Sequence, residues 1–401
     1  MASRARTILL VLVVCSALAP SNAVIPAGGG AASLGAIFNV LSFGAKTGHS
    51  YSTLAFVKAW RAACDFNGKA RVFVPAGDFT LAETIFQGPC KNPNPIFHVV
   101  GNLKAVTDVS EYAGQGWITF DTVDGLIITG GGTIDGQGQV LWQYNDCKTN
   151  PSCVHLPASV KFNNVRNAKI KSINFLNSMG FHMHITNSYL VRVHSTKITA
   201  PVDSPNTDGI HISKSQTVKI ARSIIRTGDD CVSIGQGATN ITINQVTCGP
   251  GHGISVGSLG KYDNEMDVRG LIVKNCTLLA TTNGVRIKTY AGSDPSAAAG
   301  LLFKDIRMEG VKNPIIIDQN YGRKGSSPSQ VKIIDVVYDN IYGTSVSPVA
   351  ISLTCSSSVP CKNVRFSNIN LKHVAGNLDL KSECVNANVQ SFGLQVPALC
   401  K

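Results

Sequence analysis

Short apolar stretches alternate with polar positions and turn residues along most of the chain. From residue 121 onward, β-branched stretches are separated by Gly, Asn and Ser, as in Leu126-Ile127-Ile128, Val218-Lys219-Ile220 and Ile241-Thr242-Ile243. Alternation with a period of two predicts short strands with one buried face. Because no linker or shift in composition interrupts the series, we expect one all-β domain.

These strand patterns recur at a countable interval. Four of them begin 22, 22 and 31 residues apart: Gly209-Ile210-His211-Ile212, Cys231-Val232-Ser233-Ile234, Gly253-Ile254-Ser255-Val256 and Gly284-Val285-Arg286-Ile287. A second series has intervals of 23 and 31 residues and consists of Val218, Ile241 and Ile272. The extra residues of the last repeat are expected in a loop around Ser258 to Asp267. A period near 22 predicts a parallel β-helix, a solenoid whose coils share one apolar interior.

One segment near the N-terminus has helical periodicity instead. Ser52 to Phe66 begins with a residue suited to an N-cap, has an apolar face of Phe56, Trp60 and Ala63, and is followed by Asn67-Gly68 as a stop signal. The open end of a stack of coils exposes apolar interior and an unpaired strand edge. We therefore expect a short helix that caps the N-terminal end of the solenoid.

The first 23 residues have the layout of a secretory signal: two arginines, an apolar run from Ile8 to Val14, and Ser21-Asn22-Ala23 as a cleavage site. The run is too short to span a bilayer, and no later stretch approaches the ~20 apolar residues of a transmembrane helix. The sequence thus predicts a signal peptide at 1–23 and one domain at 24–401. We expect a secreted, extracellular protein without a membrane partner.

The cysteines fit an oxidising compartment. The chain has 12, and removal of the signal with Cys15 leaves 11. Proximity in sequence suggests the pairs Cys64–Cys90, Cys147–Cys153, Cys231–Cys248, Cys355–Cys361 and Cys384–Cys400. Cys276 would be left over, and we interpret it as a small buried side chain. Asn240 and Asn275 begin glycosylation sequons, as in a secreted glycoprotein.

The net charge favours an acidic partner. The whole chain carries +12, and loss of Arg4 and Arg6 with the signal leaves +10. Nucleic acid, an anionic membrane and acidic carbohydrate would all satisfy this charge. The basic residues are scattered singly, without runs or interleaved aromatics, which makes nucleic acid the weakest candidate.

Three aspartates and a histidine fall into register. Stacked strands lie ~4.8 Å apart, so residues one coil apart in sequence become neighbours in space. Asp208 and Asp230 are 22 apart, His252 lies 22 further on, and Asp229 lies beside Asp230. Stacked carboxylates repel, which leads to a raised pKa or a shared proton. Such a cluster indicates an active site more than a structural turn.

The next positions on the same strands predict a groove. Two columns of aligned positions have small residues in the middle, which leave a groove floor, and a cation at one end. The first column is His211, Ser233, Ser255 and Arg286, and the second is Ser213, Gly235, Gly257 and Lys288. Beside an acidic cluster, such cations suit a substrate carboxylate, for which Arg offers a bidentate fork. His182 and His184 share a strand face, but no third ligand has metal spacing, so we expect neither a metal nor another cofactor.

Four motifs and a tyrosine occur in order along the chain: Asn206-Thr207-Asp208, Gly228-Asp229-Asp230, Gly251-His252-Gly253, Arg286-Ile287-Lys288 and Tyr321. Together they closely resemble the polygalacturonases of glycoside hydrolase family 28, pectin-cleaving enzymes with a right-handed β-helix. The resemblance extends over nearly all of the chain after the signal. Leu156-Pro157, Asn264-Glu265 and Asn283-Gly284-Val285 are most like the plant pollen branch, which is largely exo-acting.

The resemblance implies a role for each residue of the cluster. Asp229 would be the general acid, Asp208 and Asp230 would activate the attacking water, and His252 would help to hold the acid in its protonation state. The substrate-binding residues it implies are Asn206, Arg286, Lys288 and Tyr321. The implied activity is inverting, single-displacement hydrolysis of α-1,4-galacturonosyl linkages in polygalacturonate by a monomer in the cell wall.

Three alternatives stay open at this point. The chain could be endo-acting, a calcium-dependent pectate lyase that shares the coil, or a catalytically silent wall protein that only binds pectin. Two positions also depart from the family pattern. Tyr290 stands where many plant members have Trp, and Gly322 follows Tyr321 where many have Cys.

Overall fold

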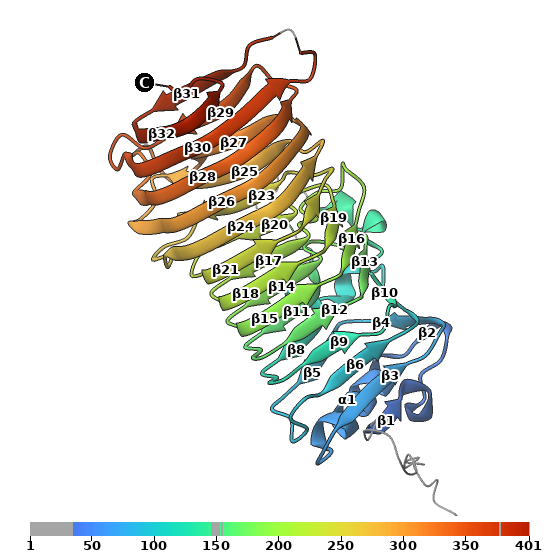
Figure 1. The fold of residues 1–401 in the computed structure, drawn as a ribbon. Helices are drawn as coiled ribbons and strands as arrows, with labels where there is room; N and C mark the ends of the chain where they lie inside the picture. The colour runs from blue at the N-terminus through green and yellow to red at the C-terminus, as the bar shows by residue number, and fades with distance from the viewer. Residues whose placement is uncertain (1–34, 146–152, 154, 377, 401) are drawn as a thin grey trace, which may run out of the picture.

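The computed structural model describes residues 35–145, 153, 155–376 and 378–400. The predicted signal peptide at 1–23 lies outside these residues. The described chain is an elongated stack of coils, with the N-terminal strands at one end and the C-terminal strands at the other (Figure 1). Each strand pairs in parallel with strands of the neighbouring coils, as between β17 and β20. The predicted parallel β-helix is confirmed.

One sheet contains eleven strands, one from each successive coil. Its members are β5 (Thr84–Gln87), β8 (Gly116–Asp121), β11 (Ala158–Asn163), β14 (Met183–Thr186), β17 (Ile210–Ser213), β20 (Val232–Ile234), β23 (Ile254–Leu259), β25 (Asn283–Ala291), β27 (Asn313–Arg323), β29 (Val349–Thr354) and β31 (Lys381–Val385). The strands β17 to β25 of this sheet carry the polar columns that the sequence predicts.

The other strands form two further columns, which fuse into one sheet of 21 strands because β24 pairs with both β21 and β22. The first column is β1 (Ala36–Asn39), β3 (Ala70–Val74), β6 (Ile96–Val99), β9 (Ile127–Thr129), β12 (Lys169–Lys171), β15 (Tyr189–His194), β18 (Gln216–Ala221), β21 (Thr239–Asn244), β24 (Val268–Leu279), β26 (Ser296–Val311), β28 (Val331–Ser345), β30 (Cys361–His373) and β32 (Ala387–Val396). The second is β2 (Gly48–Tyr51), β4 (Asp78–Leu81), β7 (Asn102–Ala105), β10 (Thr133–Asp135), β13 (Asn174–Leu176), β16 (Lys197–Thr199), β19 (Ile224–Arg226) and β22 (Thr247–Cys248).

Left-handed residues bend the chain between columns. In the long strands β24, β28 and β30 the bend falls at Asn275, Asn340 and Asn368, with φ of 54°, 53° and 54°. Asparagine tolerates this region better than most residues. The asparagines between the short apolar stretches therefore mark the corners of the coil.

The strand register is confirmed in one sheet and wrong by one residue in the other. Ile210, Val232, Ile254 and Val285 are successive partners, which reproduces the intervals of 22, 22 and 31. In the other sheet, Ile241 pairs with Leu271 and not with Ile272. Leu271 is buried whereas Ile272 is 38% exposed. Because residues 271–273 are all apolar, the sequence pattern does not show which of them face the interior. The predicted loop before β24 is present.

The predicted capping helix is confirmed as α1 (Thr53–Asp65), with Ser52 at its N-cap. Its apolar face of Phe56, Trp60 and Ala63 is buried. The Trp60 ring packs against that of Phe120, with centroids 5.5 Å apart, and its Nε1 donates to the Gln87 carbonyl oxygen at 3.0 Å. The helix therefore covers the apolar interior of the first coils.

Four of the five predicted disulfides are present: Cys64–Cys90, Cys231–Cys248, Cys355–Cys361 and Cys384–Cys400. The predicted Cys147–Cys153 pair involves Cys147, which lies outside the described residues. Cys276 is unpaired and buried, as predicted. Burial raises the pKa of its thiol to about 11, which keeps it unreactive.

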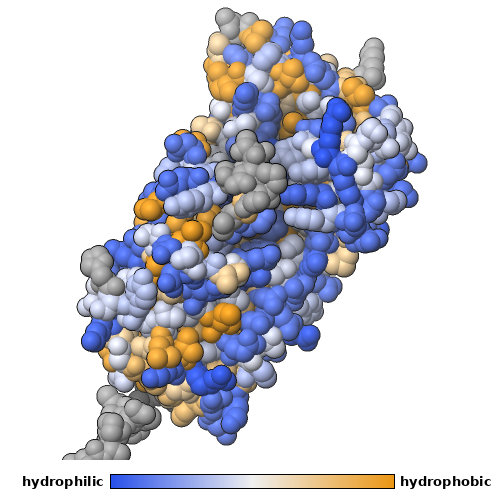
Figure 2. Space-filling model, turned by 180° about the vertical axis from the view of Figure 1, so that it is seen from behind, coloured by the Kyte–Doolittle hydropathy of each residue, from blue (hydrophilic) through white to orange (hydrophobic). Residues whose placement is uncertain are grey.

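On the face seen from behind, most of the surface is hydrophilic and hydrophobic residues form separate groups (Figure 2). Asn240 and Asn275, the two sequon asparagines, are exposed. Among the described residues, no helix is long and apolar enough to cross a membrane.

A test of the core follows from the aromatic stack inside the first coils. The Phe120 ring contacts those of Trp60, Phe86, Phe97 and Phe162, at centroid distances of 5.0 to 5.9 Å. Phe120→Ala should lower the free energy of unfolding by about 3–5 kcal/mol because it removes a buried ring and leaves a cavity. Ile85→Ala, at a half-exposed position on β5, should cost no more than about 0.5 kcal/mol. Denaturant titration measures both, and equal losses would contradict this account of the core.

Candidate active site

The predicted acidic cluster is assembled at the points where three consecutive coils enter the eleven-stranded sheet. Asp208 precedes β17, Asp229 and Asp230 precede β20, and His252 precedes β23. The Gly209 N–H donates to the Asp230 carbonyl oxygen at 2.9 Å, and the Cys231 N–H donates to that of Gly253 at 2.8 Å. Asp208, Asp230 and His252 therefore hold equivalent places on successive coils, as the 22-residue spacing predicts.

Two glycines allow the coils to approach this closely. A Cβ on Gly228 would lie 2.0 Å from the Ser204 carbonyl oxygen. Gly253 has φ of +85°, and a Cβ there would lie 2.0 Å from the Asn283 carbonyl oxygen. No side chain fits either distance. The glycines beside the aspartates and the histidine are therefore part of what places them.

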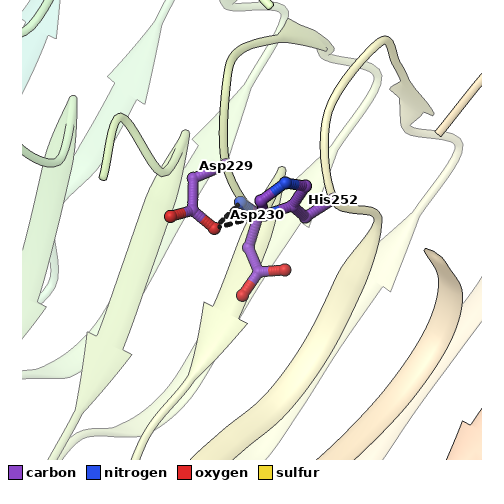
Figure 3. A group of neighbouring side chains, drawn as sticks. All are labelled: Asp229, Asp230 and His252. Carbon is purple, nitrogen blue, oxygen red and sulfur yellow. Dashed lines mark hydrogen bonds and ion pairs between the residues drawn. The ribbon is translucent and has the colours of Figure 1, made fainter. Parts of the chain in front are cut away.

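Asp229 and His252 form the accessible pair of the cluster. The Asp229 carboxylate turns toward the imidazole, with the Asp230 carboxylate beside them (Figure 3). His252 Nδ1 lies 2.9 Å from Asp229 Oδ1, which also accepts from the Asp230 backbone N–H at 2.8 Å. The side chains are 40% and 18% exposed for His252 and Asp229. Solvent and substrate can therefore reach this carboxyl.

Asp230 is buried and held by cations. Its Oδ1 accepts from Arg286 Nη2 at 2.8 Å and from Ser255 Oγ at 2.7 Å, while its Oδ2 accepts from Lys288 Nζ at 2.9 Å. Arg286 Nε also donates to Ser255 Oγ at 2.9 Å. Asp230 is 1% exposed, and the two cations are 8% and 6% exposed. The arginine and lysine expected to bind a substrate carboxylate thus also neutralise the charge of Asp230.

Asp208 is equally buried but has no cation in contact among the described residues. Its Oδ2 accepts from Ser233 Oγ at 2.6 Å, and Ser233 Oγ lies 2.8 Å from His211 Nδ1. Because a serine has one hydroxyl hydrogen, Ser233 donates to Asp208 when this carboxyl is ionised, and His211 Nδ1 then donates to Ser233. Burial and then Lys288 lower the pKa of His211 to about 4, so its ring is neutral.

The pKa values of the two aspartates move in opposite directions. Burial, then the negative charges of Asp229 and Asp230, raise the pKa of Asp208 well above its ordinary value. Burial also raises the pKa of Asp229, but the hydrogen bond and charge of His252 and the charge of Lys288 outweigh it, so the net shift is downward. Of the two carboxyls, Asp208 therefore binds a proton more readily than Asp229 in the ligand-free protein. The raised pKa expected from stacked carboxylates is found at that residue.

The remaining predicted substrate-binding residues surround the cluster. Asn206 Nδ2 donates to Asp229 Oδ2 at 3.4 Å. Tyr321 is 46% exposed, and its ring centroid lies 4.9 Å from Lys288 Nζ and 5.7 Å from the Arg286 guanidinium carbon. Seven of the eight predicted site residues thus lie in one connected network, and the eighth, Asp208, interacts electrostatically with Asp229 and Asp230.

Some residues of the site were missed by sequence reasoning. Ser233 and Ser255 had been aligned only as groove floor, yet each donates a hydrogen bond to a cluster aspartate. Asn145 was not considered at all, and its Nδ2 donates to Asn206 Oδ1 at 3.1 Å. The column alignment could have indicated the serines. No sequence spacing indicates Asn145, because it reaches the site across 61 positions of chain.

His182 and His184 each contact a neighbouring strand or turn of the fold. His182 is buried, and its Nδ1 lies 3.2 Å from the Asp208 carbonyl oxygen. His184 Nε2 lies 3.2 Å from Ser213 Oγ. Burial lowers the pKa of both imidazoles. They are hydrogen-bonded structural groups, as the sequence indicates.

Asp229, Asp230 and His252 offer ligand atoms within 4.8 Å of one another, which is a spacing that a metal ion could use. The donors are already engaged, because Asp230 accepts from Arg286 and Lys288 and His252 Nδ1 bonds to Asp229. A cation would therefore have to displace fixed positive charges. The chemistry of this donor set suits acid–base catalysis better than metal binding.

Comparison with known proteins agrees with this geometry. A family model described as glycosyl hydrolases family 28 matches residues 64–393. An exopolygalacturonase of Platanus acerifolia is 43% identical over 374 residues, 92% of this chain and 99% of that protein. An exopolygalacturonase of Arabidopsis thaliana is 46% identical over 339 residues, 84% of this chain and 79% of that protein.

Solved structures agree on the fold. An exopolygalacturonase from Thermotoga maritima has a TM-score of 0.74 at 19% identity, over 84% of this chain and 87% of that one. A polygalacturonase from Erwinia carotovora has a TM-score of 0.67 at 24% identity, over 89% and 95%. At such identities the likeness supports the fold alone, a right-handed parallel β-helix.

The two buried aspartates should respond oppositely to neutralisation. Because the folded-state pKa of Asp208 is raised, its carboxyl favours folding below the ordinary value of 3.8, and this advantage is lost as pH rises through the folded pKa. Asp208→Asn, which cannot ionise, should raise the melting temperature at pH 7 by about 2 °C or more. The gain should shrink toward pH 4.

Asp230→Asn is the matched comparison, since it makes the same chemical change one coil away. It leaves Arg286 and Lys288 buried without their carboxylate, which should cost about 3–5 kcal/mol. Thermal melts at both pH values measure the two variants. A lower melting temperature for Asp208→Asn at pH 7 would show that Asp208 is held as a stabilising anion, contrary to its surroundings.

Proposed function

This chain belongs to family 28 of the glycosyl hydrolases, and on that basis we propose that it hydrolyses α-1,4-galacturonosyl linkages of polygalacturonate from a chain end. The observation that carries the proposal is the accessible Asp229 carboxyl beside two buried aspartates, with Arg286 and Lys288 at the same groove. Paired carboxyls are what glycoside hydrolysis requires. The cations suit a substrate whose every sugar carries a carboxylate.

The cations keep donors for the substrate. Arg286 uses its Nε and one Nη2 hydrogen within the described structure, and Lys288 uses one of its three. The remaining N–H groups can donate to a galacturonate carboxylate while Asp230 stays bound. Tyr321 lies over the same cations and would contact the sugar ring, and Asn206 would bind a hydroxyl next to Asp229.

The proposed reaction is a single displacement with inversion. Water attacks the anomeric carbon and gives its proton to a carboxylate, while Asp229 donates a proton to the glycosidic oxygen as that bond breaks. Asp208 is the better acceptor of the two candidates. It accepts one hydrogen bond, whereas the oxygens of Asp230 already accept three, two of them from cations. Asp230 would orient the water and hold the cations in place.

Asp229 must gain a proton before it can act as the acid. In the free protein the charges of His252 and Lys288 favour its ionised form. A galacturonate carboxylate bound at Lys288 would offset part of that positive charge, and the sugar would exclude water from the carboxyl. Both changes raise the pKa of a carboxyl. Substrate binding would therefore help Asp229 to gain its proton, while His252 stays hydrogen-bonded to it.

Action at a chain end is supported by the relatives and by one contact. The Platanus and Arabidopsis relatives are both named exopolygalacturonases. Asn145, which follows two short 3₁₀ turns at Gly138–Val140 and Trp142–Tyr144, donates to Asn206 and to the Pro205 carbonyl oxygen. Asn145 thus lies against Asn206, which contacts Asp229, and at this place the segment would limit how far a polymer can extend.

We also propose that the protein is secreted, with 1–23 as its signal peptide, and that it acts as a monomer on pectin in the cell wall. Four disulfides among the described residues support an oxidising compartment. Detection of a mature protein that begins after Ala23 in the extracellular fraction tests the location.

Product analysis tests the activity. Incubation with polygalacturonate should release saturated monomer from the earliest times, in the presence or absence of chelator, because no metal takes part in the proposed steps. Chromatography of the sugars and ultraviolet absorbance follow the reaction. A ladder of saturated oligomers would mean endo action. Unsaturated products that disappear with chelator would mean a lyase, and the proposal would be wrong.

Asp229→Asn tests the acid. It should lower kcat by about 10²- to 10⁴-fold because the leaving oxygen loses its proton donor, while the dissociation constant for a galacturonate oligomer changes little. Asp203→Asn makes the same chemical change at an exposed position nearby and should leave both quantities unchanged. Rate assays and calorimetric titration give the two readouts. A near-normal rate for Asp229→Asn would rule out this assignment.

A further inference from the structure

We propose that a second, non-catalytic binding site for acidic polysaccharide lies on the outer face of β12, β15 and β18. Lys169, Arg192 and Lys219 stand directly opposite one another on these strands, and all three side chains are exposed. We call these three residues the cation ladder. It lies in the sheet of 21 strands, whereas β17, β20 and β23 of the eleven-stranded sheet hold the active site (Figure 1).

More positive charge flanks the ladder. Lys171 and His194 are partners two residues further along the same strands. Burial, then Arg222, Lys171 and Lys169, lower the pKa of His194, as expected in a positive field. Among the described residues, no carboxylate lies within ion-pair distance of any ladder cation. The three ladder cations are therefore not ion-paired within the described part of the chain.

The fold gains nothing from this arrangement. Like charges directly opposite each other on neighbouring strands are destabilising. Further along the same sheet, Lys274 and Lys304 are also opposite each other, but there Lys304 binds Asp339 on the next strand at 2.7 Å. A linear polyanion laid across β12, β15 and β18 would remove the repulsion. An external anionic partner thus accounts for a feature that folding does not.

The geometry favours a polysaccharide among the possible polyanions. The ladder offers one cation per coil, about every 4.8 Å, which is close to the length of one sugar unit. A shallow hollow beside it is lined by Asn94 and Asn167 as well as by Lys169 and Arg192. Amides bind hydroxyl groups and Arg192 offers a fork for a carboxylate. A chain of uronic acids presents both groups on each unit.

The site would hold the enzyme on its polymer while the groove releases chain ends. This inference shares only the identity of the polymer with the proposed function, since the ladder lies outside the groove. Its effect should therefore be large on insoluble polymer and absent on an oligomer that only the groove can bind.

The test compares two triple variants of the mature chain with equal charge change. K169Q/R192Q/K219Q removes the ladder, and K274Q/K332Q/K362Q removes three exposed lysines scattered over β24, β28 and β30. Hydrolysis of trigalacturonate should be unchanged in both. Each triple is also placed in the Asp229→Asn background, where binding to insoluble polygalacturonate is measured by depletion at low and high salt. The ladder variant should bind at least tenfold more weakly at low salt, and the scattered variant less than twofold.

Each of three other results would overturn the inference. Equal losses in the two triples would mean that overall charge alone binds the polymer. A matching loss of trigalacturonate hydrolysis in the ladder variant would mean that these residues act through the groove. Ladder-dependent binding of phosphatidylserine vesicles or of single-stranded RNA as tight as that of polygalacturonate would mean a different partner. An unmodified chain that cleaves no galacturonate would instead refute the proposed function, while the depletion measurement still tests the ladder.

Discussion

The parallel hydrogen-bond register between consecutive coils is the constraint on which the site depends. It brings Asp208, Asp230 and His252 to equivalent places because β17, β20 and β23 pair without a shift at an interval of 22 residues. A slip of one residue in the pairing of two of these strands would turn the side chains of the shifted strand to the other face. The glycines at 228 and 253 allow the turns that precede the strands to lie close enough for this register.

The register stacks negative charge, and the fold compensates it unequally. Asp230 receives two cations and a serine, whereas Asp208 receives a serine alone. Both serines come from the same column of the sheet, and each hydroxyl also contacts a nitrogen. Ser255 accepts from Arg286 Nε, and Ser233 contacts His211 Nδ1. A permanently charged guanidinium in one place and a neutral imidazole in the other give two chemically identical carboxyls different surroundings, which supports the proposed roles of Asp230 as an anchor and Asp208 as a proton acceptor.

Repeat spacing and local chemistry predicted the fold class, the capping helix, four disulfides and the cluster, because a solenoid turns sequence distance into spatial distance. Prediction failed where that relation breaks down. Leu271 replaced Ile272 as the partner of Ile241, since three apolar residues in a row have no period of two. Asn145 was missed because it arrives from a loop, and loop paths are not periodic. The partition of protons between Asp208 and Asp229 depends on burial and on hydrogen bonds, which spacing cannot supply.

The two departures from the family pattern, Tyr290 and Gly322, are one physical feature. They are strand partners, and a Cβ on Gly322 would lie 2.4 Å from the Tyr290 ring. That ring meets Tyr321 edge-on, with centroids 6.1 Å apart, and Tyr321 lies over Lys288. A larger residue at 322 would push Tyr290 aside and remove the support of Tyr321. The aromatic edge of the groove is therefore placed by a neighbouring strand, so the two departures have to be considered together and not as separate substitutions.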